Sequence, residues 1–378
     1  MLRPSLAARI VFRSDPFPAR FRQCSARLRA ARAAAFLAVL SLAGSLWAGS
    51  ARAGCDPLSE PPGSTLNAPG AATAEGASTL PSWGAGEIAD FSNEHVVVRG
   101  DSLTSIGARY GQSVRRLAET NGLDPRARLE VGQRLIVCSR HLAPRVAGLD
   151  DGIVINLPQR MAFRYVAGRL DGAWPVAVGR PDWPTPVGDF TVRTREQDKT
   201  WYVPVSIQEE MRREGKPVLT QVPPGPENPL GRHWIGLSLP AIGIHGTNAP
   251  ASVYGFRSHG CIRMHPDDVA ALFERVTLGE RGRIVYEPLL LARDARGRIW
   301  FEANPDAYRR GGGTIETVRA TAREQGIAEA AVDWAQVAKM LRERDGLARE
   351  VGPIPGGLAE AGAGAAAAGE PQSNGGNR

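Results

Sequence analysis

The sequence predicts two folded parts: a mainly β domain, sandwich-like or barrel-like with few helices, and a smaller strand–helix–helix–strand domain. Between residues 152 and 287, short apolar runs are separated by Gly, Pro and Asp, which is typical of short strands joined by turns. Between residues 94 and 139, two short helical patterns lie between two strand-like runs. A length of 378 residues is sufficient for two or three domains.

The small domain is predicted from its capping residues. A strand over 95–100 precedes a helix that Asp101 or Ser102 caps. Ser113 caps a second helix, and a second strand follows over 132–138. A unit of this size has a small core, so a covalent cross-link would help to stabilise it.

The larger domain is predicted to consist of short strands with one helix. Its apolar runs are too short for helices and are interrupted by turn residues. The strands are expected at 152–157, 162–166, 174–179, 185–192, 233–237, 241–245 and 283–286, and the helix at 266–273.

The remaining segments differ in composition. Residues 288–350 are predicted to form a C-terminal extension containing one strand and two helices. Residues 54–93, rich in Pro, Gly, Ala and Ser, are predicted to be a flexible linker, and residues 351–378 a disordered tail. Neither of these two segments carries enough periodic apolar residues to offset the entropy of ordering.

Residues 1–53 are predicted to be a secretory signal peptide. A basic stretch ends at Arg32, an uncharged apolar run covers 33–48, and Ala51-Arg52-Ala53 matches a cleavage site. The apolar run is shorter than the ~20 residues that span a bilayer. The segment also holds nine arginines and one acidic residue, which is +8, whereas the whole chain carries +7. The rest of the chain therefore carries −1, and no nucleic-acid partner is predicted.

The chain contains four cysteines, Cys24, Cys55, Cys138 and Cys261. Cleavage of the signal peptide would remove Cys24 and leave three cysteines in an oxidising compartment. An odd number indicates one disulfide with one free thiol, or a bond to another molecule. Parity alone does not say which cysteine is free.

The polar, Gly-containing stretch around Cys261 is the candidate reactive site. A thiol attacks as the thiolate, so it needs a base or a positive charge nearby. His245 lies 16 residues earlier at the end of a predicted strand, and the intervening loop is long enough to bring its imidazole to the sulfur. His259 is a second candidate. Gly260 permits a tight turn in which amide groups near the cysteine could face an oxyanion.

Two other interpretations compete with a reactive thiol. Most lone cysteines among apolar residues are buried and inert, but the sequence around Cys261 is too polar for a core strand. A metal site could use His245, His259, Cys261 and His265, but their spacing matches no zinc pattern and four ligands would leave no open position. No metal is predicted.

Residues 96–111, 117–123 and 129–137 together closely resemble a LysM repeat. The LysM family binds glycans that contain N-acetylglucosamine, peptidoglycan included. The resemblance implies that residues 94–139 bind peptidoglycan glycan strands.

Three further motifs resemble the L,D-transpeptidase catalytic domain, the YkuD family. They are Thr-Pro-Val-Gly-Asp-Phe at 185–190, His-Gly-Thr-Asn at 245–248 and Ser-His-Gly-Cys-Ile-Arg-Met at 258–264. The resemblance covers 152–287 and includes the run at 223–231. The order of LysM domain and catalytic domain resembles the periplasmic ErfK/YbiS group of Gram-negative bacteria.

The family resemblance implies a role for each motif residue. Cys261 would be the nucleophile and His245 the general base and acid. Gly246 would position His245 through its backbone carbonyl.

The other motif residues would support the nucleophile. Ser258, His259 and Gly260 would shape the site and its oxyanion hole. Arg263 would hold a substrate carboxylate or brace the loop.

The implied reaction is acyl transfer through a cysteine thioester on peptidoglycan tetrapeptide stems, without metal or organic cofactor. It would form 3–3 cross-links or attach an envelope lipoprotein. An alternative remains: a LysM-anchored peptidoglycan-binding protein with L,D-carboxypeptidase activity or none. Because catalysis requires a free thiol at Cys261, we expect a disulfide between Cys55 and Cys138.

Overall fold

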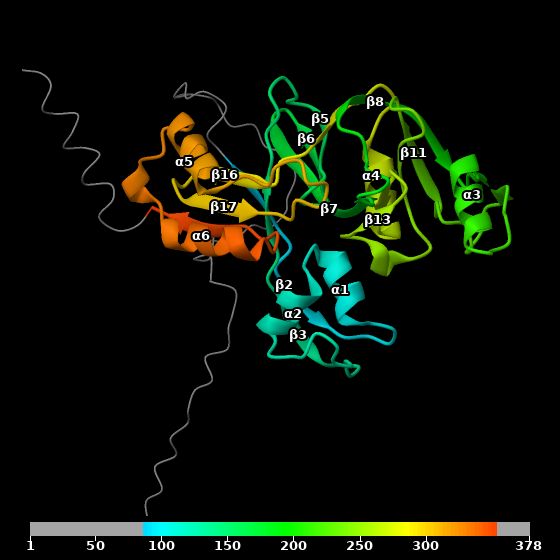
Figure 1. Ribbon diagram of the computed structural model, residues 1–378, viewed down its shortest axis with the longest axis horizontal. Helices are drawn as coiled ribbons and strands as arrows, with labels where there is room; N and C mark the ends of the chain where they lie inside the picture. Colours follow the sequence, from blue (N-terminus) through cyan, green and yellow to red (C-terminus); the bar gives the residue numbers. More distant parts are fainter. Residues whose placement is uncertain (1–85, 354–378) are drawn as a thin grey trace, which may run out of the picture. The chain divides into compact units, whose positions relative to one another are not determined.

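The computed structural model describes residues 86–353 of the chain (Figure 1). The predicted signal peptide at 1–53, most of the predicted linker and most of the predicted tail lie outside the described residues, and they remain predictions. Within residues 86–353, no helix has both the length and the apolar character needed to cross a membrane.

The small domain contains the predicted elements in the predicted order (cyan in Figure 1). Ser102 caps the first helix by accepting a hydrogen bond from the Ser105 amide, and Ser113 caps the second. Ile106, Leu117 and other apolar residues fill the core between helices and strands. The elements are β2 (Asn93–Val96), α1 (Leu103–Tyr110), α2 (Val114–Thr120) and β3 (Arg134–Val137), with β2 and β3 antiparallel.

The larger domain is built on one nine-stranded sheet. Its order is β13-β7-β14-β12-β11-β8-β15-β5-β6, and β6 also pairs with β7. The strands are β5 (Gly152–Asn156), β6 (Met161–Val166), β7 (Arg169–Gly179), β8 (Gly188–Gln197), β11 (His233–Leu237), β12 (Gly243–His245), β13 (Phe256–Ser258), β14 (Ile262–Met264) and β15 (Arg281–Val285).

The long strand β7 closes this sheet on itself. Its first part pairs with β6 through residues 169–175, and Val176 and Ala177 pair with β14. Apolar side chains from β5, β7, β8, β11, β12 and β14 form the main core, which α4 (Pro266–Arg275) completes through Val269 and Leu272. A mainly β domain with few helices is thus confirmed, and the continuous ladder makes it barrel-like.

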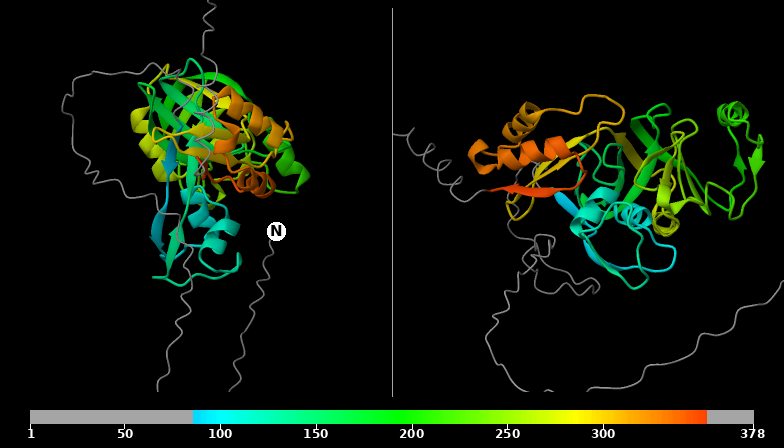
Figure 2. Two further views of the ribbon diagram at one scale, coloured as in Figure 1. Left: turned by 90° about the vertical axis from the view of Figure 1, so that its left-hand side faces the viewer. Right: turned by 60° about the horizontal axis from the view of Figure 1, so that its bottom comes forward.

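A flap between β8 and β11 was not predicted. It consists of β9 (Trp201–Tyr202), α3 (Val205–Arg213) and β10 (Gln221–Val222), and both views show α3 standing out from the barrel (Figures 1 and 2). None of the α3 residues is buried, and its three apolar residues, Val205, Ile207 and Met211, are too few to have marked so short a helix in the sequence. η1 (Pro250–Ser252) is a short turn of 3₁₀-helix between β12 and β13.

The predicted linker extends too far at its C-terminal end. Residues 87–90 form β1 (Glu87–Asp90), which pairs antiparallel with β4 (Arg140–Ala143). Ala89 is buried, and the Glu87 carboxylate accepts hydrogen bonds from Arg145 at 2.5 Å and from the Leu170 amide at 2.9 Å. These contacts order a segment that composition alone assigned to the linker.

The C-terminal extension forms a small α/β layer with its own core. Phe301, Val337 and Met340 are among the residues buried between its sheet and helices. The predicted strand and both helices are present, and two further strands complete the sheet. The elements are β16 (Leu289–Arg293), β17 (Ile299–Ala303), α5 (Ile315–Glu324), η2 (Glu329–Ala331), α6 (Trp334–Glu343) and β18 (Arg349–Gly352), in the sheet order β16-β17-β18.

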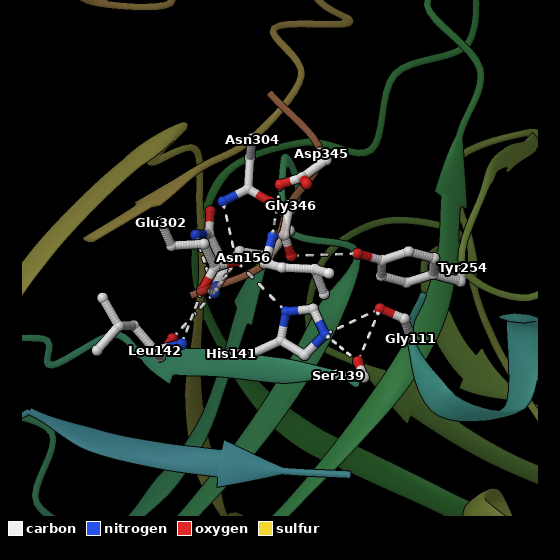
Figure 3. Close-up of polar contacts among 12 residues, drawn as sticks. Gly111, Ser139, His141, Leu142, Asn156, Tyr254, Glu302, Asn304, Asp345 and Gly346 are labelled. Atoms are coloured by element: carbon white, nitrogen blue, oxygen red, sulfur yellow. Dashed lines mark hydrogen bonds and ion pairs between the residues drawn. The ribbon is translucent and has the colours of Figure 1, made fainter. Parts of the chain in front are cut away.

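A buried polar cluster centred on Glu302 joins the extension to the rest of the molecule (Figure 3). The fully buried Glu302 carboxylate accepts hydrogen bonds from the Leu142 amide at 2.7 Å, from Gln159 at 2.9 Å and from Asn304 at 3.1 Å. It also faces Nδ1 of His141 at 3.3 Å.

His141 connects this cluster to the small domain. Its Nε2 lies 3.0 Å from the Gly111 carbonyl at the end of α1 and 3.2 Å from Ser139 Oγ (Figure 3). The contacts from Ser139 to His141 and on to Glu302 resemble those of a hydrolase triad. All three residues, however, are 0% exposed. No substrate could reach this serine, so the cluster is structural.

Glu302→Gln tests the importance of this cluster for stability. The amide keeps the size of the side chain but removes its charge and points an NH₂ group at neighbouring donors. We expect the free energy of unfolding to fall by about 3 kcal/mol, because several buried donors would lose a charged acceptor. Urea unfolding followed by circular dichroism measures it. Glu350→Gln is the control, since Glu350 is exposed and lies 3.9 Å from its partner Arg298; equal losses for both variants would refute the argument.

Candidate active site

The pairing of β12 with β14 brings the two main candidate residues together. The strands run parallel, with Ile244 opposite Ile262 and His245 opposite Arg263. Cys261 directly precedes β14 and therefore lies beside Gly243, on the face that also carries His245. Residues 16 positions apart in the sequence thus become neighbours on one face of the sheet.

Cys261 carries a free thiol and is half-buried. Its Sγ lies 3.5 Å from the Ala241 carbonyl, to which the thiol donates. Burial raises the pKa of the thiol; the Gly243 backbone amide and the positive charge of Arg263 act in the opposite direction but do not cancel this effect. The sulfur is accordingly protonated at neutral pH.

His245 is buried and held in one tautomer. Its Nδ1 donates to the Gly246 carbonyl at 2.7 Å, so Nε2 is the unprotonated nitrogen of the neutral ring. Burial, and secondly the charge of Arg263, lower the pKa of His245 to about 4. The ring is therefore a neutral base at physiological pH. That the Gly246 carbonyl positions His245 for a reaction remains a prediction.

Trp234 on β11 packs on the His245 ring. The two rings are stacked, with centroids 5.7 Å apart and planes 21° apart. Glycine is required at 243, because a Cβ atom there would lie 2.5 Å from the Trp234 ring. The same glycine exposes the backbone amide that hydrogen-bonds to the Cys261 sulfur.

Hydrogen bonds of the Ser258 side chain stabilise the turn before Cys261. The buried Ser258 Oγ donates to the Cys261 carbonyl and accepts from the Gly260 amide at 3.2 Å. Gly260 adopts a φ of +105°, in the region that favours glycine. The carbonyl of Gly260 accepts a hydrogen bond from Thr185 Oγ1 at 2.8 Å.

His259 contacts the flap. Its Nε2 lies 2.5 Å from a Glu210 oxygen on α3, and its ring packs edge-on against Trp183 with centroids 5.0 Å apart. The other Glu210 oxygen accepts from Arg180 at 3.0 Å. His259, and secondly Arg180, lower the pKa of Glu210. Sequence reasoning missed both partners of His259, because Glu210 and Trp183 are distant from it in the sequence and belong to none of the motifs.

Arg263 places a cation beside the thiol. Among residues 86–353 no carboxylate forms an ion pair with its guanidinium, and burial lowers its pKa. A half-buried guanidinium without a carboxylate partner is suited to bind a carboxylate of a ligand.

These side chains line one cavity of about 480 Å³ between the barrel and the flap. A volume of this size accommodates a small peptide segment. Its walls include His245, Ser258, His259, Cys261 and Arg263 from the barrel, and Trp201, Ile207, Glu210 and Met211 from the flap.

The residues of the metal alternative do not converge. Within the described part of the chain, no three His, Cys, Asp or Glu side chains are placed to share an ion. His265, one of the four, caps α4 and contacts Arg109 at 3.3 Å, while His259 bonds to Glu210. The geometry instead fits a thiol with a neutral base.

The disulfide prediction is supported at one end. Cys138 is disulfide-bonded. The expected partner, Cys55, lies outside the described residues, so the pairing with Cys138 remains a prediction.

Residues 150–285 match the model of the L,D-transpeptidase catalytic domain, YkuD, and residues 95–137 match that of the LysM domain. The putative L,D-transpeptidase YkuD of Bacillus licheniformis is 31% identical over 186 residues, which cover 48% of this chain and 92% of that protein. The chain belongs to the L,D-transpeptidase family.

Two further relatives of this chain come from Gram-negative bacteria. The probable L,D-transpeptidase ErfK/SrfK of Salmonella typhimurium is 34% identical over 209 residues, covering 53% of this chain and 65% of the relative. The probable L,D-transpeptidase YbiS of Escherichia coli is 31% identical over 159 residues, covering 41% and 51%. The match therefore spans less than two thirds of the length of each.

The protonation of the site can be tested by alkylation of Cys261. Because the His245 pKa of about 4 lies below that of the thiol, the proton stays on sulfur at neutral pH. The rate of alkylation by iodoacetamide should rise about tenfold per pH unit from pH 6 to 8, in step with the thiolate fraction. Intact-mass spectrometry follows the reaction, with Cys261→Ser as the background. A rate that is constant from pH 6 upward would show a preformed thiolate–imidazolium pair instead.

Proposed function

We propose that this chain is a cysteine L,D-transpeptidase that acts on peptidoglycan tetrapeptide stems. The single observation that carries the proposal is that a free thiol and a buried, neutral imidazole of fixed tautomer line one cavity. Arg263 in the same cavity has no carboxylate partner within the described part of the chain, and its guanidinium suits a substrate with free carboxylates, as stem peptides have.

In the first half-reaction, Cys261 attacks the carbonyl that joins the third residue of the stem, diaminopimelate, to the terminal D-Ala. Nε2 of His245 takes the thiol proton as the C–S bond forms. Backbone amides near Cys261 stabilise the oxyanion. The tetrahedral intermediate collapses, His245 gives its proton to the departing amine, and D-Ala leaves behind a thioester.

In the second half-reaction, an amine attacks the thioester. His245 accepts a proton from the attacking amine and returns one to the sulfur, which restores the free thiol. A diaminopimelate amine of another stem gives a 3–3 cross-link, and a lysine amine of an envelope lipoprotein gives attachment of that protein. Water in place of the amine gives carboxypeptidase activity. Protein groups and substrate supply every proton in this scheme, so it requires no cofactor.

The LysM domain fits this proposal as the part that holds glycan strands near the catalytic domain. A peptidoglycan substrate places the protein in the periplasm, in agreement with the predicted signal peptide at 1–53. The LysM-anchored binding protein without activity is the alternative that the following experiment distinguishes.

Incubation of the mature protein with purified tetrapeptide muropeptides, with products read by mass spectrometry, tests the proposal. We expect loss of D-Ala and formation of 3–3 linked dimers. Hydrolysed tripeptides alone would identify a carboxypeptidase, and unchanged muropeptides would contradict any activity on this substrate.

Substitutions should separate the roles of the site residues. Cys261→Ala should abolish D-Ala release, and His245→Ala should lower its rate by about 10²–10⁴, as for a positioned acid–base group. His259→Ala should cost less, because its Nε2 is engaged by Glu210. His265→Ala is the control, since this histidine lies outside the cavity lining. Substantial activity in Cys261→Ala would overturn the mechanism.

A further inference from the structure

Tyr308 of the C-terminal extension contacts segments that adjoin the candidate active site. This residue lies beyond the stretch that matches the catalytic-domain model, 150–285. Its ring stacks on Tyr286, with centroids 5.4 Å apart and planes 21° apart, and packs edge-on against Phe256 at 5.8 Å. Phe256 begins β13, the strand that leads into the turn before Cys261.

The Tyr308 hydroxyl makes two backbone hydrogen bonds near that turn. It donates to the Gly179 carbonyl at 2.8 Å and accepts from the Thr185 amide at 3.2 Å. The side chain of Thr185 is fully buried; its Oγ1 accepts from the Gly179 amide at 2.9 Å and donates to the Gly260 carbonyl at 2.8 Å. A continuous chain of hydrogen bonds therefore runs from Tyr308 through Thr185 to Gly260.

The Gly260 carbonyl belongs to the peptide bond that Cys261 completes. In a trans peptide the C=O and the following N–H point in opposite directions in one plane. Fixing this carbonyl on Thr185 therefore fixes the direction of the Cys261 N–H. Gly260 has a φ of +105° and lacks a Cβ, so without this bond the turn could sample other conformations.

Tyr308 is itself firmly supported. Tyr286 donates to Asp306 at 2.6 Å, and its oxygen accepts from the Tyr308 amide at 2.9 Å. Asp306 also accepts from the amides of Arg310 at 2.9 Å and Gly311 at 3.1 Å. The loop is thus braced so that the hydroxyl of Tyr308 is held in place.

We propose that Tyr308 is a positioning residue for the reaction at Cys261: through Thr185 it orients the Gly260–Cys261 peptide, whose N–H faces the oxyanion. This inference rests on the proposed function, in which Cys261 forms an acyl thioester. It gives the C-terminal extension a part in catalysis, although no residue of 288–350 lines the cavity.

Two small probes separate orientation of the N–H from reactivity of the sulfur. Acylation of Cys261 by p-nitrophenyl acetate passes through an oxyanion as the sulfur attacks the ester and p-nitrophenolate leaves. Alkylation by iodoacetamide displaces iodide and forms no oxyanion. In Tyr308→Phe, which keeps the ring but loses the hydroxyl, acylation should slow about tenfold while alkylation stays within about twofold.

Thr185 and Tyr165 supply the matched variants. Thr185→Val should slow acylation at least as much as Tyr308→Phe, and Thr185→Ser should restore it, since serine retains the hydroxyl. Tyr165→Phe also removes a buried hydroxyl that donates to a carbonyl, that of Pro144 at 2.8 Å, but this residue does not line the cavity. Tyr165→Phe should lower the free energy of unfolding in urea about as much as Tyr308→Phe does. Its acylation rate should remain that of the wild-type protein.

The proposal is overturned if acylation and alkylation fall together in Tyr308→Phe, or if Tyr165→Phe slows acylation equally. It is also overturned if acylation is unchanged in Tyr308→Phe. These probes contain no peptidoglycan, so they report on Tyr308 separately from the proposed function. Wild-type protein that is acylated normally but releases no D-Ala from muropeptides would contradict the proposed function alone.

Discussion

The parallel pairing of β12 with β14 is the constraint on which the site depends. Its register sets His245 opposite Arg263 and Cys261 beside Gly243, so thiol, imidazole and guanidinium share one face. A shift of one residue would turn the side chains of one strand to the other face and separate them. The closed ladder opposes such a shift, because β14 is also paired with β7 and β12 with β11.

Burial then determines how this face behaves chemically. It lowers the pKa of His245 and raises that of Cys261, so the two rest as a neutral pair. In a neutral pair neither the thiol nor the imidazole is a desolvated charge in the resting protein, and in the proposed mechanism charge forms on them only during attack. Arg263 belongs to the same balance, because its charge disfavours protonation of His245 and favours the thiolate. The site is therefore poised for proton transfer and does not store a preformed ion pair.

Much of this architecture could be predicted from the sequence, because helix caps and short motifs indicate it locally. Ser102 and Ser113 cap the helices of the LysM domain as expected, and the motif around Cys261 pointed to a turn that lines the cavity. The flap could not be predicted, since α3 has only three apolar residues, Val205, Ile207 and Met211, and buries none of them. Glu210 and Tyr308 contact residues distant in the sequence, for which spacing and periodicity give no signal. Thr185 opens one of the family motifs, but its hydrogen bond to Gly260 could not be predicted from the motif. Closure of the barrel likewise depends on the two pairings of β7.

The central claim is that Cys261 carries the acyl group of the substrate as a thioester. Its most direct test is the intact mass of the protein after rapid acid quenching of a reaction with tetrapeptide stems, followed by peptide mapping. We expect a mass gain equal to the stem acyl group without D-Ala, located on Cys261 and absent in Cys261→Ala. Release of D-Ala by a protein that never carries an adduct, or an adduct on another residue, would contradict the account.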